Sequence, residues 1–422
     1  MNAAPANKTG NPSAPALSRQ RCWSIVGLIF VVALINYFDR QSLSVVAPRL
    51  QAQLHLSDEG YGHIVSLFLL ASAFSYAGAG LIADWLGTRA SMALFVGWWS
   101  LAEASTAFVT SAFQLAVARF CLGLGEPGLW VAAPKGVGEI FARKERGLAI
   151  GIYTLGAMIG AVIALPVIVA VTTHFHWRAI FLLDGAAGIL WIPLWFLVFR
   201  RSSTADVPSE SRLTDEHGSL RDVLSQGSTW RLMIARGLTD PVWYFYLFWF
   251  PKYLLSARHM TMAAVAHQGW LVYLFAGAGT LLGGMVSGTF IRRRVPASIA
   301  YRRTMLIFAM IVPLSPLAGL VAKSWVAIAI ASVIALAHMA WLVTLTATIV
   351  ELYPVAEVGR AAGLIAAGSA LGGMLSTEVI AALVTSHGYL PVFTLMAFLH
   401  PLALLLIWNS FHQRRSVVAV PA

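Results

Sequence analysis

Apolar runs of about twenty residues alternate with short polar or glycine- and proline-containing breaks along almost the whole chain. A helix needs roughly 20 apolar residues to cross a membrane. The runs predict twelve spans in two groups of six. They cover residues 22–47, 60–83, 89–109, 112–136, 146–171 and 178–199, then 231–256, 266–291, 303–321, 324–350, 358–384 and 389–411.

The composition agrees with this pattern, because 58% of the 422 residues are hydrophobic and only 11% are charged. Soluble globular proteins carry about twice that share of charge. We therefore predict an all-α membrane protein with two six-helix halves. The expected divisions are a tail (1–21), the first half (22–199), a linker (200–230), the second half (231–411) and a second tail (412–422).

The basic residues lie mainly in every second loop, and this asymmetry explains the net charge of +11. The positive-inside rule then places both termini of this multi-pass protein in the cytoplasm. The first run is longer than a signal-peptide core and has no small-residue cleavage site, so we expect an uncleaved N-terminus. Basic residues scattered over short loops do not indicate nucleic-acid binding. Cys22 and Cys121 both fall in apolar runs, so no disulfide framework is predicted.

An internal repeat recurs at an offset of 212 residues, with Glu145, Gly147, Ala149 and Gly151 matched by Glu357, Gly359, Ala361 and Gly363. A weaker likeness relates residues 80–89 to residues 284–293. Parallel repeats of this kind place a substrate near mid-membrane, between two halves that rock for alternating access.

Two neighbouring charges, Asp39 and Arg40, interrupt the first apolar run. Charges inside a span normally face a protein interior or a water-filled path. Arg119, in the fourth span, lies at a similar predicted depth, so it and Arg40 could bind one anion through their planar guanidinium groups. Glu126 shares the face of Arg119 at i+7, and Tyr37 shares the face of Arg40, whereas Asp39 is rotated by about 100°.

These charges suggest a coupling scheme. Burial disfavours a charged carboxylate, so Glu126 and also Asp39 are candidates to take up protons. Protonation frees an arginine from its internal carboxylate, and an external organic anion then binds with the proton. The alternative is that Asp39, Arg40, Arg119 and Glu126 form a buried ion network that only holds the helices together.

Several motifs together resemble a known family. Residues 80–89 resemble the loop signature of the major facilitator superfamily, and residues 119–126 resemble its fourth-span motif. With residues 36–40, 240–252 and 338–341, the chain resembles the anion:cation symporters, nearest their hexuronate and galactonate branch. The resemblance implies that Arg40 binds a substrate carboxylate and that Asp39 and Glu126 carry protons. Together with the short loops, it also implies a carrier of the inner membrane.

The loop signature implies a conformational latch formed by Gly80, Asp84, Gly87 and Arg89. Trp85 and Thr88 replace arginines that are usual in the superfamily, and Gly288 stands where the second half often has an aspartate. We therefore expect a latch with fewer charges. The tenth span is poor in amide side chains, which favours a substrate with fewer hydroxyl groups than a hexuronate.

Aromatic and imidazole side chains could line the pocket from the second half or simply face the core or lipid; the candidates are Trp243, Tyr244, Tyr246, His338 and Trp341. Further ionisable residues in or near spans have no predicted role beyond local pairing: Glu103, Asp184, Arg236, Asp240 and Glu378. The outer histidines lack ligand spacing on one helical face, so no metal site is predicted.

We therefore predict a monomeric, proton-coupled importer of a small organic anion, such as a sugar acid, which uses the proton gradient and no cofactor. Two alternatives remain: a proton-coupled exporter of drugs or metabolites, and a sensor that binds an anion without transporting it. An enzyme is not indicated, because the chain shows no nucleophile and base set, phosphate loop or metal cluster.

Overall fold

The computed structural model describes residues 18–56, 58–199 and 220–408. Every regular element in these residues is a helix, as predicted. Most of the predicted N-terminal tail, residues 200–219 of the predicted linker, and the C-terminal tail lie outside them. The described end of the linker contains a short helix, α7 (Leu220–Ser225), and the start of α8 at Gly227.

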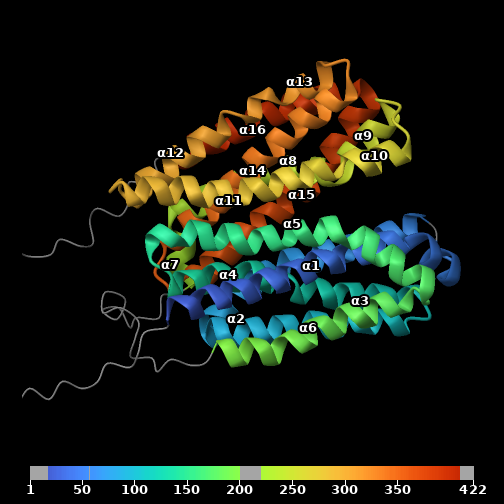
Figure 1. Ribbon diagram of the computed structural model, residues 1–422, viewed down its shortest axis with the longest axis horizontal. Coiled ribbons are helices and arrows are strands. Elements are labelled where there is room, and N and C mark those ends of the chain that lie inside the picture. The colour runs from blue at the N-terminus through green and yellow to red at the C-terminus, as the bar shows by residue number, and fades with distance from the viewer. Residues whose placement is uncertain (1–17, 57, 200–219, 409–422) are drawn as a thin grey trace, which may run out of the picture.

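The two predicted halves form two layers of helices (Figure 1). The first layer contains α1 (Arg19–Leu54), α2 (Asp58–Ser105), α3 (Ala112–Gly125), α4 (Pro127–Ile140), α5 (Arg143–His174) and α6 (Arg178–Val198). The second contains α8 (Gly227–Tyr244), α9 (Phe250–Ser256), α10 (Met262–Gln268), α11 (Trp270–Arg292), α12 (Ala297–Ala309), α13 (Ser315–Leu320), α14 (Ser324–Leu352), α15 (Val358–His387) and α16 (Leu390–Ile407).

The layers meet where α5 packs along α11 and where α2 packs along α15. The repeat explains this pairing, because its two copies, residues 145–151 and 357–363, lie at the starts of α5 and α15. Each copy therefore contacts a helix of the opposite half.

Within the described residues, 10 helical stretches are long and apolar enough to cross a membrane. One of them, His63–Phe108, contains the second and third predicted spans, so the 10 stretches account for all predicted spans except the seventh. The seventh, predicted at 231–256, consists of α8, a π-helical turn (Phe245–Trp249) and α9. It carries more charge than its neighbours, including Arg236 and Asp240.

Two helix interruptions position candidate residues. Gly87 has a φ of 73°, a left-handed conformation that costs glycine little, and it separates the second span from the third within α2. Pro127 has no N–H to donate to the preceding turn, so the fourth span is divided into α3 and α4. Glu126 lies at that division.

We call the end of the bundle where α1, α5, α8 and α15 begin the terminal end, and the opposite end the distal end. At the terminal end the two halves are in backbone contact. A Cβ atom on Gly284 would lie 2.2 Å from the carbonyl oxygen of Gly147, and one on Gly80 would lie 2.6 Å from that of Gly359. Glycine therefore permits this close approach, and the terminal end is closed.

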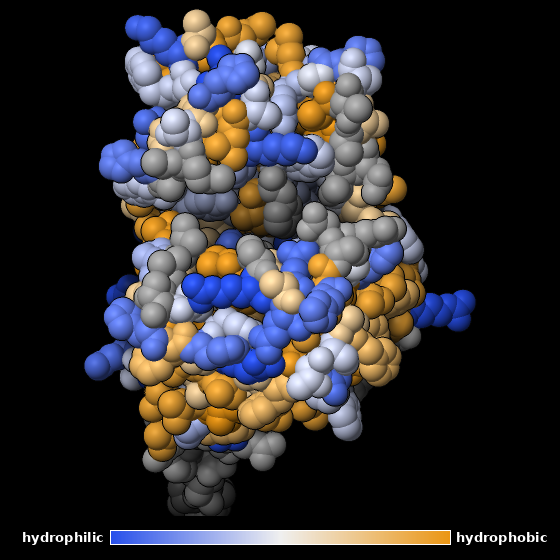
Figure 2. Space-filling model, turned by 90° about the vertical axis from the view of Figure 1, so that its right-hand side faces the viewer, coloured by the Kyte–Doolittle hydropathy of each residue, from blue (hydrophilic) through white to orange (hydrophobic). Residues whose placement is uncertain are grey.

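The distal end is less tightly packed between the halves. A cavity of about 450 Å³ lies between α5 and the helices of the second half, and Pro166, Tyr246 and Tyr273 are among its lining residues. Figure 2 looks onto this end and shows a face that is hollowed between the upper and lower halves. The structure thus combines a closed terminal end with a more open distal end.

Candidate functional site

Arg40 lies in the interior of the molecule, beside the break between α3 and α4. Its Nε atom is 2.7 Å from Oε2 of Glu126. The Glu126 side chain is fully buried, whereas 32% of the Arg40 side chain is exposed. Among the described residues, nothing accepts a hydrogen bond from the Nη atoms of Arg40. The guanidinium is therefore neutralised by an internal carboxylate and still presents unused N–H groups.

The surroundings of Arg40 place it at the space between the halves. Its Cζ atom lies 5.4 Å from the centre of the Tyr37 ring, on the shared helix face that the spacing predicts. Tyr76 on α2 also interacts with it electrostatically, and so does Tyr244 on α8 of the opposite half. Both halves therefore contribute to the surroundings of this guanidinium.

Asp39 points away from Arg40 into a cluster of acidic side chains inside the first half. Carboxylate oxygens of Asp39, Glu103 and Asp184 lie within 4.8 Å of one another, and all three residues are buried. Neither oxygen of Asp39 accepts a hydrogen bond from an N–H or a neutral hydroxyl group, whereas Asp184 accepts one of 3.4 Å from the Ser42 hydroxyl. The cluster joins α1, α2 and α6.

Arg119 lies beside this cluster and does not share the position of Arg40. Its Nη2 atom is 3.1 Å from Oε2 of Glu103 and donates a 3.0 Å hydrogen bond to Thr106, and only 3% of its side chain is exposed. The sequence predicts that Arg119 and Arg40 bind one anion together. In the structure they have separate partners, since Glu103 on α2 supplies the counter-charge for Arg119 and Glu126 that for Arg40. The cluster geometry could hold a cation, but the Arg119 charge beside it opposes metal binding; the lack of a metal site stays a prediction.

The aromatic candidates of the second half divide into two groups. Trp243 and Tyr244 face the first half, because Trp243 interacts with Tyr37 and Tyr244 with Arg40. The Tyr244 hydroxyl also lies 3.2 Å from that of Ser369 in its own half. Tyr246 lines the distal cavity. The other two candidates are enclosed in the second half.

His338 and Trp341 both lie inside that half, on α14, with no exposed surface. Nδ1 of His338 is 3.2 Å from Nε2 of His400, and the Trp341 ring packs at 5.3 Å against His400. His338 stacks behind Trp243, with ring centres 6.3 Å apart. These buried rings support Trp243 from behind and do not line the space themselves.

Asp84 connects the two halves at the terminal end. Its carboxylate accepts hydrogen bonds from the backbone N–H groups of Gly359 and Arg360, at 3.0 and 2.9 Å, and from Nε of Arg360 at 2.7 Å. Nζ of Lys135 is 3.2 Å away. A carboxylate at the start of a helix is favoured by the unpaired N–H groups and by the helix dipole. Asp84 therefore caps α15 of the opposite half.

The other latch candidates take different positions. Gly80 makes the close contact with Gly359, and Gly87 makes the turn after Asp84. Arg89 donates to the carbonyl oxygen of Phe199 and lies over the Phe196 ring, so it binds α6 of its own half. In the pseudo-equivalent position of the second half, Gly288 packs against the carbonyl oxygen of Lys144.

Sequence reasoning missed Lys135 and Arg360, which complete the Asp84 contact. Lys135 also donates a 2.8 Å hydrogen bond to the carbonyl oxygen of Val355. A signal for Lys135 was available in the sequence, because this lysine lies in the same apolar run as Glu126.

Four other candidates without an assigned role are paired locally, since Glu103 binds Arg119, Asp184 binds Ser42, and Arg236 binds Asp240. The Glu378 side chain lies outside the described part.

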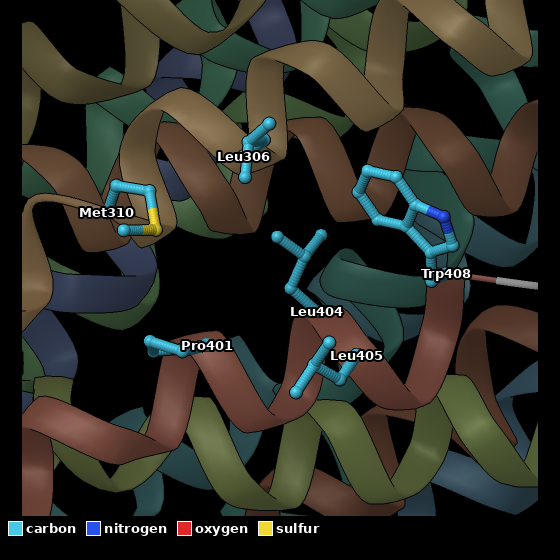
Figure 3. A pocket seen from close by; sticks show the side chains of 6 residues that line it. All are labelled: Leu306, Met310, Pro401, Leu404, Leu405 and Trp408. Carbon is cyan, nitrogen blue, oxygen red and sulfur yellow. The ribbon is translucent and has the colours of Figure 1, made fainter.

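A second hollow, of about 530 Å³, lies on the outer face of the second half. Figure 3 shows its lining, with Leu306 and Met310 from α12 and Pro401, Leu404, Leu405 and Trp408 from the α16 segment. None of these side chains carries a charge. A groove of this kind suits lipid chains and offers nothing that binds an anion.

The sequence matches the Major Facilitator Superfamily over residues 29–347. The chain belongs to this superfamily. It is 26% identical over 415 residues to a hexuronate transporter of Escherichia coli (strain K12), with 94% of this chain and 95% of that protein covered. A galacturonate transporter of Dickeya chrysanthemi is 28% identical over 322 residues, covering 73% of this chain and 93% of that protein.

The fold of the superfamily is also found in a solved proton:xylose symporter, with a TM-score of 0.74 at 15% identity and with 92% of this chain and 96% of the other covered. The predicted family and fold are thus confirmed. As a superfamily member, the chain is a membrane transporter and not an enzyme.

Proposed function

We propose that this transporter is a proton-coupled symporter that imports a small organic anion such as a hexuronate, an aldonate or a related carboxylate. The observation that carries the proposal is the state of Arg40, a partly exposed guanidinium whose internal partner, Glu126, is fully buried. An arginine in this position can exchange an internal carboxylate for an external one. The hexuronate and galacturonate transporters among its relatives support this substrate class.

Protonation of Glu126 couples the two ligands. The charged pair is stable in the interior because each member neutralises the other. When a proton neutralises Glu126, Arg40 is left without a counter-charge, and a substrate carboxylate replaces it through the free Nη groups. The empty, deprotonated carrier is neutral at this pair, and so is the carrier loaded with both proton and anion. Both forms can therefore reorient without an unpaired charge.

The acidic cluster around Asp39 supports a second site for protons. Asp39, Glu103 and Asp184 share one neighbouring guanidinium, that of Arg119. Three buried negative charges beside one positive charge would leave unpaired charge in the interior, which is costly. Protons held among these carboxylates remove that cost. Glu103 has an ion pair with Arg119 and Asp184 has a hydrogen bond from Ser42, whereas no ion pair or hydrogen-bond donor lies at Asp39 among the described residues. We therefore assign Asp39 as the residue that exchanges them.

Alternating access supplies the path. With both termini in the cytoplasm, as the distribution of basic residues predicts, the closed terminal end faces inward and the more open distal end faces outward. The described conformation then corresponds to a carrier ready to receive an anion from outside. We place the protein in the inner membrane as a monomer, with the proton gradient as its energy source and no cofactor.

A transport assay in proteoliposomes tests the proposal. We expect labelled D-glucuronate or D-galacturonate to accumulate when the external buffer is more acidic than the lumen, and accumulation to stop when a protonophore collapses the gradient. Accumulation only with the opposite gradient would indicate an exporter. Binding of the anion without any flux would indicate a sensor.

A further inference from the structure

A second arginine–carboxylate pair, Arg236 and Asp240, lies on α8 in the opposite half. Nε of Arg236 is 3.0 Å from Oδ2 of Asp240, one helical turn along the same helix. The Arg236 side chain is 16% exposed and that of Asp240 is 7% exposed. Charges inside a span are rare unless they serve a polar path or a ligand, and the proton-coupled scheme above does not use this pair.

Arg236 borders the same space as Arg40. Tyr76 on α2 and Tyr244 on α8 both interact electrostatically with Arg236. The same two tyrosines interact with Arg40. Helix packing places these residues near one another, because α15 contacts both Tyr76, through Gly363, and the residue after Arg236, through Gly372. Arg40 and Arg236 are both partly exposed, so they border one space from opposite halves.

The two pairs also use their atoms in the same way. In each pair the arginine donates through Nε to one carboxylate oxygen, and the second oxygen, Oε1 of Glu126 or Oδ1 of Asp240, is buried without a partner. In the described structure the Nη atoms of Arg236 have no hydrogen-bond partner, like those of Arg40. The Nη atoms of both arginines therefore lack a partner without being fully buried. They remain accessible to a ligand.

From this geometry we infer that the transported substrate is a dianion, such as a dicarboxylate, with one acidic group bound by Arg40 and the other by Arg236. The inference rests on the proposed anion transport and specifies its substrate class. A planar carboxylate matches the two Nη groups of a guanidinium. As at Arg40, the substrate carboxylate can replace Asp240 when a proton neutralises Asp240. With Glu126 and Asp240 both protonated, a monocarboxylate neutralises only one of the two arginines, whereas a dianion that spans the space neutralises one in each half and draws the halves together.

A purely structural role predicts a different arrangement. The contacts between helices at the terminal end show what structural charges do here: Asp84 accepts three hydrogen bonds and Lys135 reaches a carbonyl oxygen of the other half. Among the described residues, the ion pair of Arg236 is with Asp240 of its own helix, so the pair does not join two helices. Its remaining donors are available for recognition.

The test compares two probes that differ in their charge: D-glucuronate, with one carboxylate, and D-glucarate, with the same carbon chain and a carboxylate at each end. Binding to the full-length protein in detergent is measured by titration calorimetry. For the wild type we expect D-glucarate to bind about 10- to 100-fold more tightly, the range expected for a gained hydrogen bond between charged groups.

The deciding variant is the double substitution R236Q/D240N, which removes both charges and leaves no unpaired buried carboxylate. We expect it to bind D-glucarate only as well as D-glucuronate, while its affinity for D-glucuronate stays within about threefold of the wild type, which also shows that the protein is folded. The matched control is R302Q, because Arg302 packs on the Trp408 ring at 4.5 Å on the outer side of the same half.

Equal affinities of the wild type for the two probes, or a double variant that keeps the preference for D-glucarate, would overturn the dianion inference and leave anion transport intact. A wild type that binds neither probe would overturn the proposed anion transport, and the dianion inference with it. Loss of the preference in R302Q as well would show that any removed arginine has this effect, and would also overturn the inference.

Discussion

The two halves of this transporter distribute their buried polar groups differently. The first half contains a layer of ionisable side chains, in which Arg40 pairs with Glu126 and Arg119 lies beside the acidic cluster of Asp39. The second half fills the corresponding region with rings, such as the His338 and His400 pair. In the proposed scheme, the first half therefore carries the charge chemistry of coupling, while the second half mainly shapes the space and contributes one arginine pair.

Removing Arg40 should have the largest effect, because its partly exposed guanidinium, beside the buried Glu126, is the proposed anion-binding group. For Arg40→Ala we expect anion affinity to fall by roughly 100-fold or more, since a bidentate, charge-assisted contact is lost. A thermal-shift titration measures this, because a ligand that binds only the folded state raises its stability.

The matched control for Arg40 is Arg49→Ala on the same helix, whose exposed side chain donates to the Thr172 carbonyl oxygen. The double variant R40A/E126Q avoids leaving Glu126 unpaired and should also fail to bind. Near-normal affinity in either Arg40 variant would remove the carboxylate-binding role.

Glu126→Gln should separate coupling from binding. Glutamine keeps the shape of the side chain but cannot exchange a proton, so we expect exchange of labelled for unlabelled anion to continue while accumulation driven by a pH gradient is lost. Glu145→Gln serves as the control, because Glu145 pairs with the exposed Arg19 at the terminal end. Intact gradient-driven accumulation in Glu126→Gln would show that the proton is carried elsewhere.

Asp84→Asn weakens the contact that joins the halves. Because asparagine loses the charge that faces Arg360, Lys135 and the start of α15, we expect uptake to fall by about tenfold, the effect of losing roughly 1.4 kcal/mol from the closed terminal end. Hydrogen exchange should become faster in peptides that cover residues 355–363. Unchanged exchange in these peptides would contradict the latch role.

His400→Phe should have the smallest effect. The His338 and His400 pair is enclosed in the second half, so we expect uptake to stay within about threefold and its pH profile to keep its shape. Phenylalanine is an aromatic ring similar in size to histidine, so the substitution needs little repacking of the neighbouring side chains. A shifted pH profile would show that the second half also takes part in proton coupling and would remove the contrast between the halves.

Much of the architecture could be predicted from the chain, because long apolar runs have few structures available to them in a membrane. The repeat also predicted which helices play equivalent roles, and its glycines lie at the contact between the halves. The seventh span was harder to describe, since the π-helical turn before Pro251 depends on how α8 and α9 pack and not on local pattern alone.

The pairing of charges was less accessible from sequence. Equal depth suggested that Arg40 and Arg119 face one anion, but depth does not specify rotation or the neighbouring helix. Glu103 lies on the preceding span, near the end of α2, and its rotation toward Arg119 was not predicted. Arg360 is far from Asp84 in sequence and reaches it from the opposite half. Contacts between distant segments follow from the packed helices, and a single sequence does not contain them.

The most direct test of the account follows protons and anion together. Proteoliposomes loaded with a pH-sensitive dye, with no initial gradient, should show acidification of the lumen when D-glucuronate or D-glucarate is added outside. The wild type should acidify, and Arg40→Ala and Glu126→Gln should not. Anion entry without acidification in the wild type, or acidification that persists in Glu126→Gln, would contradict the central claim that Arg40 exchanges Glu126 for the substrate as a proton binds.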